Sequence, residues 1–90
     1  MAGFKLYTKK FCPYCTRAIS ILKSAGIHEY EEIPIEGRES EFRQKLMDLT
    51  GRWDVPQAFF GTKYLGDDDG LASLAQSGEL QRLADNESGK

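Results

Sequence analysis

The chain has 90 residues, and 12 Lys and Arg against 14 Asp and Glu give it a formal net charge of −2. A hydrophobic fraction of 40% is too high for a disordered chain, and charges interrupt it too often for a membrane span. Because the net charge is slightly negative, neither nucleic acid nor a membrane is expected as a partner. The length fits a single domain over residues 1–90, ordered from about 3 to 84, with a frayed tail at 85–90.

The N-terminal part of the chain predicts a βαβ unit. Alternating apolar and polar residues over 4–8 are typical of a short strand. Apolar residues at helical spacing predict a helix over 13–25, with Pro13 at its first position. Residues 27–35 favour a second strand, and Pro34 restricts it to a sheet edge. Two strands joined through a helix need a crossover, so parallel pairing is expected.

A second helix is predicted over residues 38–50. Phe42, Leu46 and Leu49 repeat there at i, i+4 and i+7, and Gly51 follows the last turn. This spacing places three apolar side chains on one helix face, so we expect that face to pack against the sheet.

A β-hairpin is predicted in the second half of the chain. Aromatic-rich runs at 57–60 and 63–65 flank Gly61 and Thr62, and this pattern is typical of a two-residue type II′ turn. Phe59 and Phe60 are expected to lie in the core.

The C-terminal part of the chain predicts two helical segments. Aspartates in the loop over 66–70 are expected to cap a helix that stops near Gly78, and Leu80 and Leu83 predict one more short turn. The complete order predicts an α/β fold, with a four-stranded mixed sheet (a βαβ unit, a helix, a β-hairpin and a C-terminal helix) and helices on both faces.

The only two cysteines, Cys12 and Cys15, flank the start of the first predicted helix. Free N–H groups and the positive dipole end of a helix favour thiolate over thiol, and Lys9 and Lys10 add positive charge nearby. Cys12 stands outermost and is expected to attack a disulfide. Cys15 is expected to face inward and to resolve the mixed disulfide that results.

Two other roles for the cysteines are less consistent with the sequence. A structural disulfide closing so short a loop removes only about 2 kcal/mol of chain entropy. No apolar leader precedes the cysteines, so a reducing cytoplasm is expected, where structural disulfides are rare. A zinc site needs four ligands, and the chain offers two cysteines and a distant His28, so no metal is expected. A Cys-x-x-Cys between a first strand and a helix instead indicates a redox motif.

Four spaced motifs resemble those of dithiol glutaredoxins, over nearly the whole chain from about Phe4 to Leu83. They are Tyr7-Thr8-Lys9, Cys12-Pro13-Tyr14-Cys15, Val55-Pro56-Gln57, and Gly66 with Asp68-Asp69. The resemblance implies a thioredoxin fold and a glutathione-disulfide oxidoreductase. It also implies that glutathione is the co-substrate and that protein disulfides and glutathionylated proteins are reduced. We expect a cytoplasmic monomer with no bound cofactor.

The resemblance also implies roles for residues around the thiols. Cys12 is the nucleophile and Cys15 the resolving thiol. Tyr14 walls the glutathione groove, Lys9 faces the glycine carboxylate of glutathione, and Arg52 assists Lys9.

Other implied contacts involve the cysteinyl and γ-glutamyl parts of glutathione. The backbone of Val55 pairs with the cysteinyl part and is held by Pro56, which is expected to be cis. Asp68 and Asp69 fall where the family binds the γ-glutamyl end, through backbone N–H groups and a carboxylate that faces the α-amine. This polarity suits glutathione, because two carboxylates and one ammonium need cations at one end of the site and an anion at the other.

Three positions depart from the family pattern. Asp67 replaces a second glycine, Asp68 replaces a residue that is often cysteine, and Asp54 replaces the threonine before Val-Pro. These additional carboxylates are expected to oppose thiolate formation and to weaken the binding of the carboxylates of glutathione.

Alternative interpretations stay open at this point. A redoxin linked to thioredoxin reductase and serving ribonucleotide reductase has the same fold without needing Lys9 and Asp69. A [2Fe–2S] carrier holds its cluster between two chains through Cys12 and glutathione. The site residues also have purely structural interpretations. Tyr14 then only covers the helix start, Lys9 is a solvated lysine, and the aspartates only cap a helix.

Overall fold

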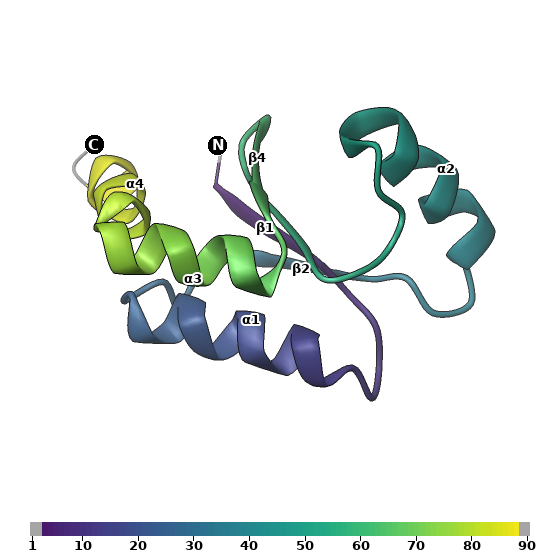
Figure 1. Ribbon diagram of the computed structural model, residues 1–90, viewed down its shortest axis with the longest axis horizontal. Coiled ribbons are helices and arrows are strands. Elements are labelled where there is room, and N and C mark those ends of the chain that lie inside the picture. The colour runs from purple at the N-terminus through teal and green to yellow at the C-terminus, as the bar shows by residue number, and fades with distance from the viewer. Residues whose placement is uncertain (1–2, 89–90) are drawn as a thin grey trace.

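The computed structural model describes residues 3–88 and shows an α/β fold (Figure 1). In chain order the elements are β1 (Phe4–Thr8), α1 (Pro13–Ser24), β2 (Glu31–Pro34), α2 (Glu39–Thr50), β3 (Gln57–Phe60), β4 (Lys63–Gly66), α3 (Asp68–Ser77) and α4 (Glu79–Ser88). The predicted fold class is confirmed, including the βαβ unit and the hairpin.

The four strands form one mixed sheet in the order β2-β1-β3-β4. β1 pairs in parallel with β2, whereas β1 with β3 and β3 with β4 pair antiparallel. β2 is an edge strand, as Pro34 requires, because proline has no N–H to donate to a neighbour on its other side.

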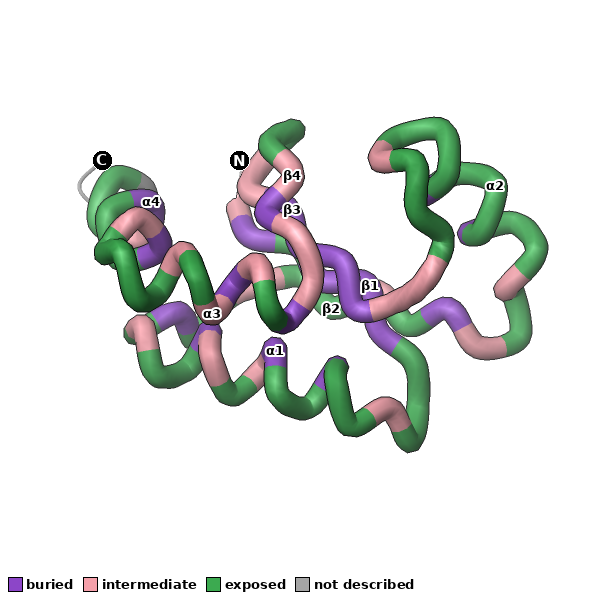
Figure 2. The backbone as a smooth tube through the Cα atoms, viewed as in Figure 1, coloured by how far each residue is buried: buried purple, intermediate pink, exposed green. Residues whose placement is uncertain are grey.

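Alternation along the strands divides the core between the two faces of the sheet. The larger cluster lies against α1, α3 and α4, and it comprises Phe4, Leu6, Ala18, Leu22, Ile27, Ala58, Leu65, Leu71, Leu80 and Leu83. The smaller cluster lies against α2 and comprises Tyr7, Ile35, Phe42, Leu46 and Phe59. Figure 1 shows α2 alone on its side of the sheet, and Figure 2 shows the buried positions concentrated on the strands and on the inward sides of the helices.

Two details differ from the sequence-based expectations. Leu49 is 59% exposed, because Phe42 and Leu46 already fill the narrow contact of α2 with the sheet. α4 is a ten-residue helix rather than one turn, and it continues through residues 85–88 of the expected tail because burial of Leu80 and Leu83 anchors it.

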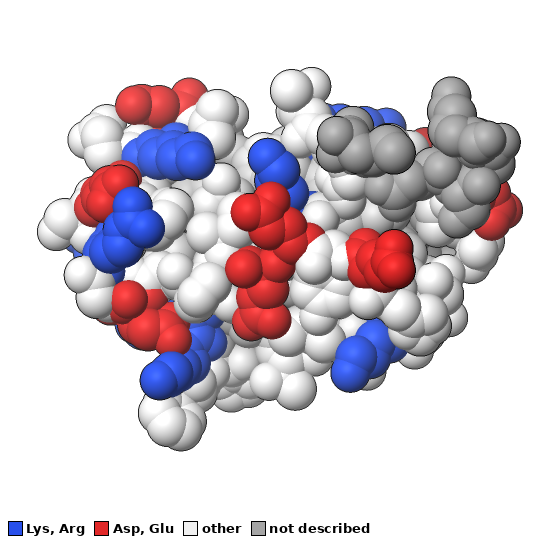
Figure 3. Space-filling model, turned by 180° about the vertical axis from the view of Figure 1, so that it is seen from behind, with Lys and Arg blue, Asp and Glu red and all other residues white. Residues whose placement is uncertain are grey.

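Surface charge is distributed without one large region of a single sign on the face drawn in Figure 3. A short column of acidic side chains lies at the centre of that face, with basic and acidic groups interspersed around it. No helix within residues 3–88 is both long enough and apolar enough to span a membrane.

Candidate active site

The loop between β1 and α1 places Cys12 at the first helical turn. Cys12 is the N-cap residue of α1, and its Sγ accepts a hydrogen bond of 3.2 Å from the backbone N–H of Cys15. Pro13 occupies the first position of the helix, where a missing N–H costs nothing. A hydrogen bond to sulfur at this position stabilises a thiolate, so the local geometry suits a nucleophile.

The two thiols have different environments. Cys15 is buried, with 3% of its surface exposed, whereas Cys12 is partly exposed. Burial raises the pKa of the Cys15 thiol from 9.0 to about 12, and the neighbouring Cys12 contributes further to this rise. Cys15 is therefore a protonated, protected thiol beside an accessible one, as predicted from the two positions on the helix.

Gln57 fixes the segment that faces the cysteines from across the groove. It is 1% exposed, and its Nε2 donates to the backbone oxygens of Arg52 and Asp54, both at 2.8 Å. Its Oε1 accepts from Thr50 Oγ1 at 2.9 Å. The peptide bond between Val55 and Pro56, just before Gln57 in the chain, is cis, as the resemblance implied.

The first of two cavities in the groove, here termed the basic cavity, has a volume of about 360 Å³ and opens onto Cys12. Its walls include three cations, Lys9, Lys10 and Arg43, and two carboxylates, Glu39 and Asp54. The remaining lining residues are Phe11, Cys12, Pro13, Ile35, Trp53 and Val55. A carboxylate of a ligand therefore finds an excess of positive charge beside the reactive sulfur.

Aromatic side chains form the outer walls of the basic cavity. Phe11, immediately before Cys12, is fully exposed and has a φ of 57°. Trp53 is half exposed, and the Cζ of Arg43 lies 4.4 Å from the centroid of its ring. A left-handed backbone holding a bulky, exposed side chain is uncommon, so Phe11 is a prominent part of the surface around Cys12.

The second cavity, here termed the acidic cavity, has a volume of about 300 Å³ and shares Asp54 and Val55 with the basic cavity. We treat the two cavities as one continuous groove because of these shared walls. The acidic cavity is lined by Tyr14, Arg17, Asp54, Val55, Pro56, Asp67, Asp68 and Asp69.

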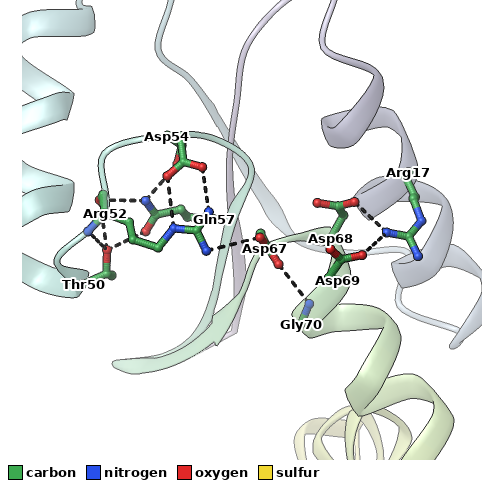
Figure 4. Close-up of polar contacts among 9 residues, drawn as sticks. All are labelled: Arg17, Thr50, Arg52, Asp54, Gln57, Asp67, Asp68, Asp69 and Gly70. Atoms are coloured by element: carbon green, nitrogen blue, oxygen red, sulfur yellow. Dashed lines mark hydrogen bonds and ion pairs between the residues drawn. The ribbon is translucent and has the colours of Figure 1, made fainter.

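Two arginines pair with the aspartates of the acidic cavity, and Figure 4 shows the two separate sets of contacts that result. Arg52 binds Asp54 through two nitrogens, at 2.7 and 3.2 Å, and lies 3.3 Å from Asp67. These carboxylates raise the pKa of Arg52. The other Asp67 oxygen accepts from the N–H of Gly70 at 3.0 Å and so caps α3.

Arg17 of α1 makes the second pairing, with the start of α3. One of its nitrogens lies 2.6 Å from Asp68 and 2.7 Å from Asp69. The Asp68 side chain is 8% exposed and that of Asp69 is 83% exposed, so of these two aspartates Asp69 is the one whose carboxylate reaches solvent.

The structure brings most of the proposed site residues into the groove. Lys9, Cys12 and Val55 line the basic cavity, and a second set lines the acidic cavity: Tyr14, Val55, Pro56, Asp68 and Asp69. Arg52 lines neither cavity, because Asp54 and Asp67 hold its guanidinium.

Several residues in or beside the groove have no role in the sequence-based interpretation, among them Arg17, Arg43 and Gln57. Arg17 and Arg43 come from helices far apart in the sequence, and nothing in their local pattern marks them. Gln57 follows Val-Pro directly, so its position in that motif was an available signal. Within residues 3–88, no three His, Cys, Asp or Glu side chains gather as a metal site would require.

The fold and this thiol pair define a class of protein, the thioredoxin-fold thiol oxidoreductases. A family model described as Glutaredoxin matches residues 4–65. Glutaredoxin 3 of Escherichia coli strain K12 is 39% identical over 83 residues, covering 92% of this chain and 98% of the relative. The chain therefore belongs to the glutaredoxin family and has the thiol-disulfide oxidoreductase activity of that family.

Solved structures agree with this assignment. Oxidized glutaredoxin 2 from Chlamydomonas reinhardtii has a TM-score of 0.85 and 32% identity, with 98% of this chain and 83% of that chain covered. A buckwheat glutaredoxin–glutathione complex has a TM-score of 0.82 and 24% identity, with 91% of this chain and 76% of that chain covered. The buckwheat structure shows the shared fold alone.

Proposed function

We propose that this protein is a glutathione-dependent oxidoreductase that reduces protein disulfides and glutathione mixed disulfides through Cys12 and Cys15. The observation that carries the proposal is the pairing of an accessible, hydrogen-bonded Cys12 sulfur with a buried Cys15 thiol, beside a groove of opposite charges. The proposal places the reaction in a reducing compartment such as the cytoplasm, where glutathione supplies the electrons.

The first step of the reaction uses Cys12 alone. Its thiolate attacks the glutathione sulfur of a mixed disulfide, a new sulfur–sulfur bond forms, and the substrate thiolate leaves and takes up a proton. A second glutathione thiolate then attacks the same glutathione sulfur. This step returns Cys12 to its thiolate and forms glutathione disulfide.

Cys15 provides an alternative second step. In the free protein, Cys12 contributes to the raised pKa of Cys15 by a hydrogen bond and by its charge. Both effects end when Cys12 is bound in a mixed disulfide, so Cys15 then loses its proton more readily. With a protein disulfide as substrate, the Cys12 thiolate attacks one substrate sulfur and the other substrate sulfur leaves as a thiolate. The Cys15 thiolate then attacks Cys12 and releases the first substrate sulfur as a thiolate. The internal disulfide that remains is reduced by two glutathione molecules, which become glutathione disulfide.

The basic cavity supports the choice of glutathione as the reductant. Lys9 and Lys10 stand beside Cys12, where the glycine carboxylate of glutathione would bind, and Tyr14 lies at the opposite side of the motif in the acidic cavity. Asp69 offers an exposed carboxylate to the ammonium group of glutathione.

The test is a glutathione-coupled assay with two substrates, a glutathionylated peptide and a protein disulfide. Cys12→Ser is expected to lose activity on both by at least about a hundredfold, because the nucleophile is absent. Cys15→Ser is expected to keep the first activity and lose most of the second. Full activity of Cys12→Ser would falsify the mechanism.

The same preparation separates the two alternative functions. Reduction by thioredoxin reductase faster than by glutathione would favour the redoxin interpretation. A coloured protein with charge-transfer absorbance under anaerobic conditions would favour the cluster carrier. The proposed function predicts neither result.

A further inference from the structure

The groove beside Cys12 has opposite electrical character at its two ends. The basic cavity has three cations against two carboxylates, whereas four aspartates and one arginine line the acidic cavity. The reactive sulfur opens onto the basic cavity, and Tyr14 of the same motif lines the acidic one. A substrate bound at the sulfur therefore meets positive charge on one side and negative charge on the other.

The arginines do not reverse the sign of the acidic cavity. Arg17 is the one cation among the described residues that line it, and Asp68 and Asp69 share its guanidinium. Arg52 is held by the other two aspartates, Asp54 and Asp67. With both guanidiniums counted, four carboxylates leave two negative charges in excess.

This excess discriminates between the charged groups at the γ-glutamyl end of glutathione. The ammonium group is attracted, but the adjacent α-carboxylate meets aspartates and no uncommitted cation among the described lining residues. Asp67 adds to this effect, because its own carboxylate already occupies the N–H of Gly70 at the start of α3. A group with a cation and no carboxylate suits this end better than the γ-glutamyl group does.

We propose that the groove selects peptide and protein disulfides whose reacting cysteine has a basic residue on its N-terminal side and an acidic residue on its C-terminal side. Asp54 and Asp67 are the specificity-determining residues, because each adds negative charge to the acidic cavity and together they hold Arg52 away from a substrate carboxylate. The orientation rests on the proposed function, in which the γ-glutamyl side of glutathione faces the aspartates and its glycine side faces Lys9.

The experiment measures the rate at which reduced Cys15→Ser protein reacts with three tripeptide disulfides. The peptides are Lys-Cys-Glu, Glu-Cys-Lys and Ala-Cys-Ala with blocked ends, each joined through its cysteine to 5-thio-2-nitrobenzoate. Cys12 attacks the peptide sulfur, the bond to the aromatic sulfur breaks, and the released aromatic thiolate is followed by its absorbance. Lys-Cys-Glu is expected to react about tenfold faster than Glu-Cys-Lys at low salt, with Ala-Cys-Ala between them.

Two asparagine substitutions test the residues named in the proposal. Asp54→Asn with Asp67→Asn keeps the side-chain shapes, and asparagine still caps α3, so the fold is retained. The rate ratio between the two charged peptides is expected to fall to about threefold. Asp48→Asn with Asp85→Asn, the same change of two charges on α2 and α4 and outside both cavities, is the matched control and keeps the full ratio.

Equal rates for the two charged peptides, a faster Glu-Cys-Lys, or a ratio unchanged in the double variant would each overturn the proposal. Absence of reaction with all three disulfides, the neutral one included, would refute the proposed function and this inference with it. A normal rate for Ala-Cys-Ala with no charge preference would refute the inference alone.

Discussion

Cys12 and Cys15 differ in chemistry because the first turn of α1 points them into different surroundings. The Cys12 sulfur caps the helix and accepts the N–H of Cys15, whereas the Cys15 sulfur is buried under the helix. A buried thiolate without a cationic partner is costly, and this cost raises the pKa of Cys15 to about 12. One residue type thus supplies both an exposed and a protected thiol.

Alkylation of the reduced protein should distinguish the two thiols. At pH 8, iodoacetamide is expected to add one group per chain, at Cys12, because Cys15 is buried and protonated. The rate at Cys15 should rise about tenfold per pH unit up to its pKa, since only the thiolate reacts. Mass spectrometry of peptides gives both rates, and Cys12→Ser is the control that should lack the fast reaction. Equal labelling of both cysteines at pH 8 would contradict this prediction.

Gln57 is the residue that holds the groove wall opposite the thiols. The hydrogen bonds of its side-chain amide with Thr50, Arg52 and Asp54 connect the end of α2 to the start of β3. Because its side chain is buried, each lost partner would leave a polar group poorly satisfied.

Gln57→Leu is expected to lower the free energy of unfolding by about 2–3 kcal/mol, since it leaves the Asp54 carbonyl oxygen without its donor and removes the acceptor of the Thr50 hydroxyl. Urea denaturation measures the change. Gln44→Leu, an exposed glutamine on α2, is the matched control and should stay within about 0.5 kcal/mol of the parent. If both variants lost the same stability, the hydrogen bonds of Gln57 would not be the cause.

At the scale of elements, the start of α3 both ends the loop after β4 and supplies aspartates to the acidic cavity. Asp67 caps the helix through Gly70, and the two following aspartates pair with Arg17 of α1. Gly70 is required here by space, because a Cβ at this position would lie 2.7 Å from the backbone oxygen of Leu65. The acidic cavity is thus built on a helix end that packing holds close to β4.

Asp67 is expected to stabilise the protein by its cap and its charge. The N–H of Gly70 is the main cause of its lowered pKa, and Arg52 adds to the effect. Asp67→Ala should cost about 1 kcal/mol near neutral pH, and Asp67→Asn should cost less because asparagine also caps.

The dependence of these differences on pH is a further check. A carboxyl with a lowered folded pKa contributes stability above its ordinary pKa of 3.8, and that contribution is lost as the pH falls through the folded value. Urea denaturation of the parent and Asp67→Asn should therefore converge in acid. A difference that stays constant from pH 7 to pH 2 would exclude the charge as its source.

For the whole molecule, the unequal helix cover of the sheet predicts unequal stability. α1, α3 and α4 share the larger core cluster, whereas α2 alone covers the smaller one. Figure 2 shows that most of α2 is exposed. α2 buries less apolar surface against the sheet, so separating it from the sheet costs less free energy.

Native-state hydrogen exchange should show α2 opening before the rest of the fold. We expect its amides to exchange with an opening free energy roughly 2 kcal/mol below that of α1. Leu46→Ala, which shortens a fully buried side chain on α2, should widen this difference, whereas Leu71→Ala on α3 should lower the stability of the larger unit. Identical opening energies for α1 and α2 would show that the molecule unfolds only as one unit.

The sequence by itself determined the elements and the chemistry of the thiols. Periodicity placed the helix after Cys12, the edge strand with Pro34 and the hairpin around Gly61, because these signals come from neighbours along the chain. The cysteine spacing and the helix start were enough to predict one accessible and one buried thiol. Local patterns are reliable here because local sterics and hydrogen bonds cause them.

Only the tertiary structure decided which charges meet in the groove. Arg52 was expected to help bind a carboxylate, but folding places it between Asp54 and Asp67. Arg17 pairs with aspartates about fifty positions further along the chain, and no local pattern marks that contact. Ion pairs depend on distance in space, which local sequence does not reveal. The length of α4 also depended on tertiary structure, because its leucines meet their core only after the sheet has formed.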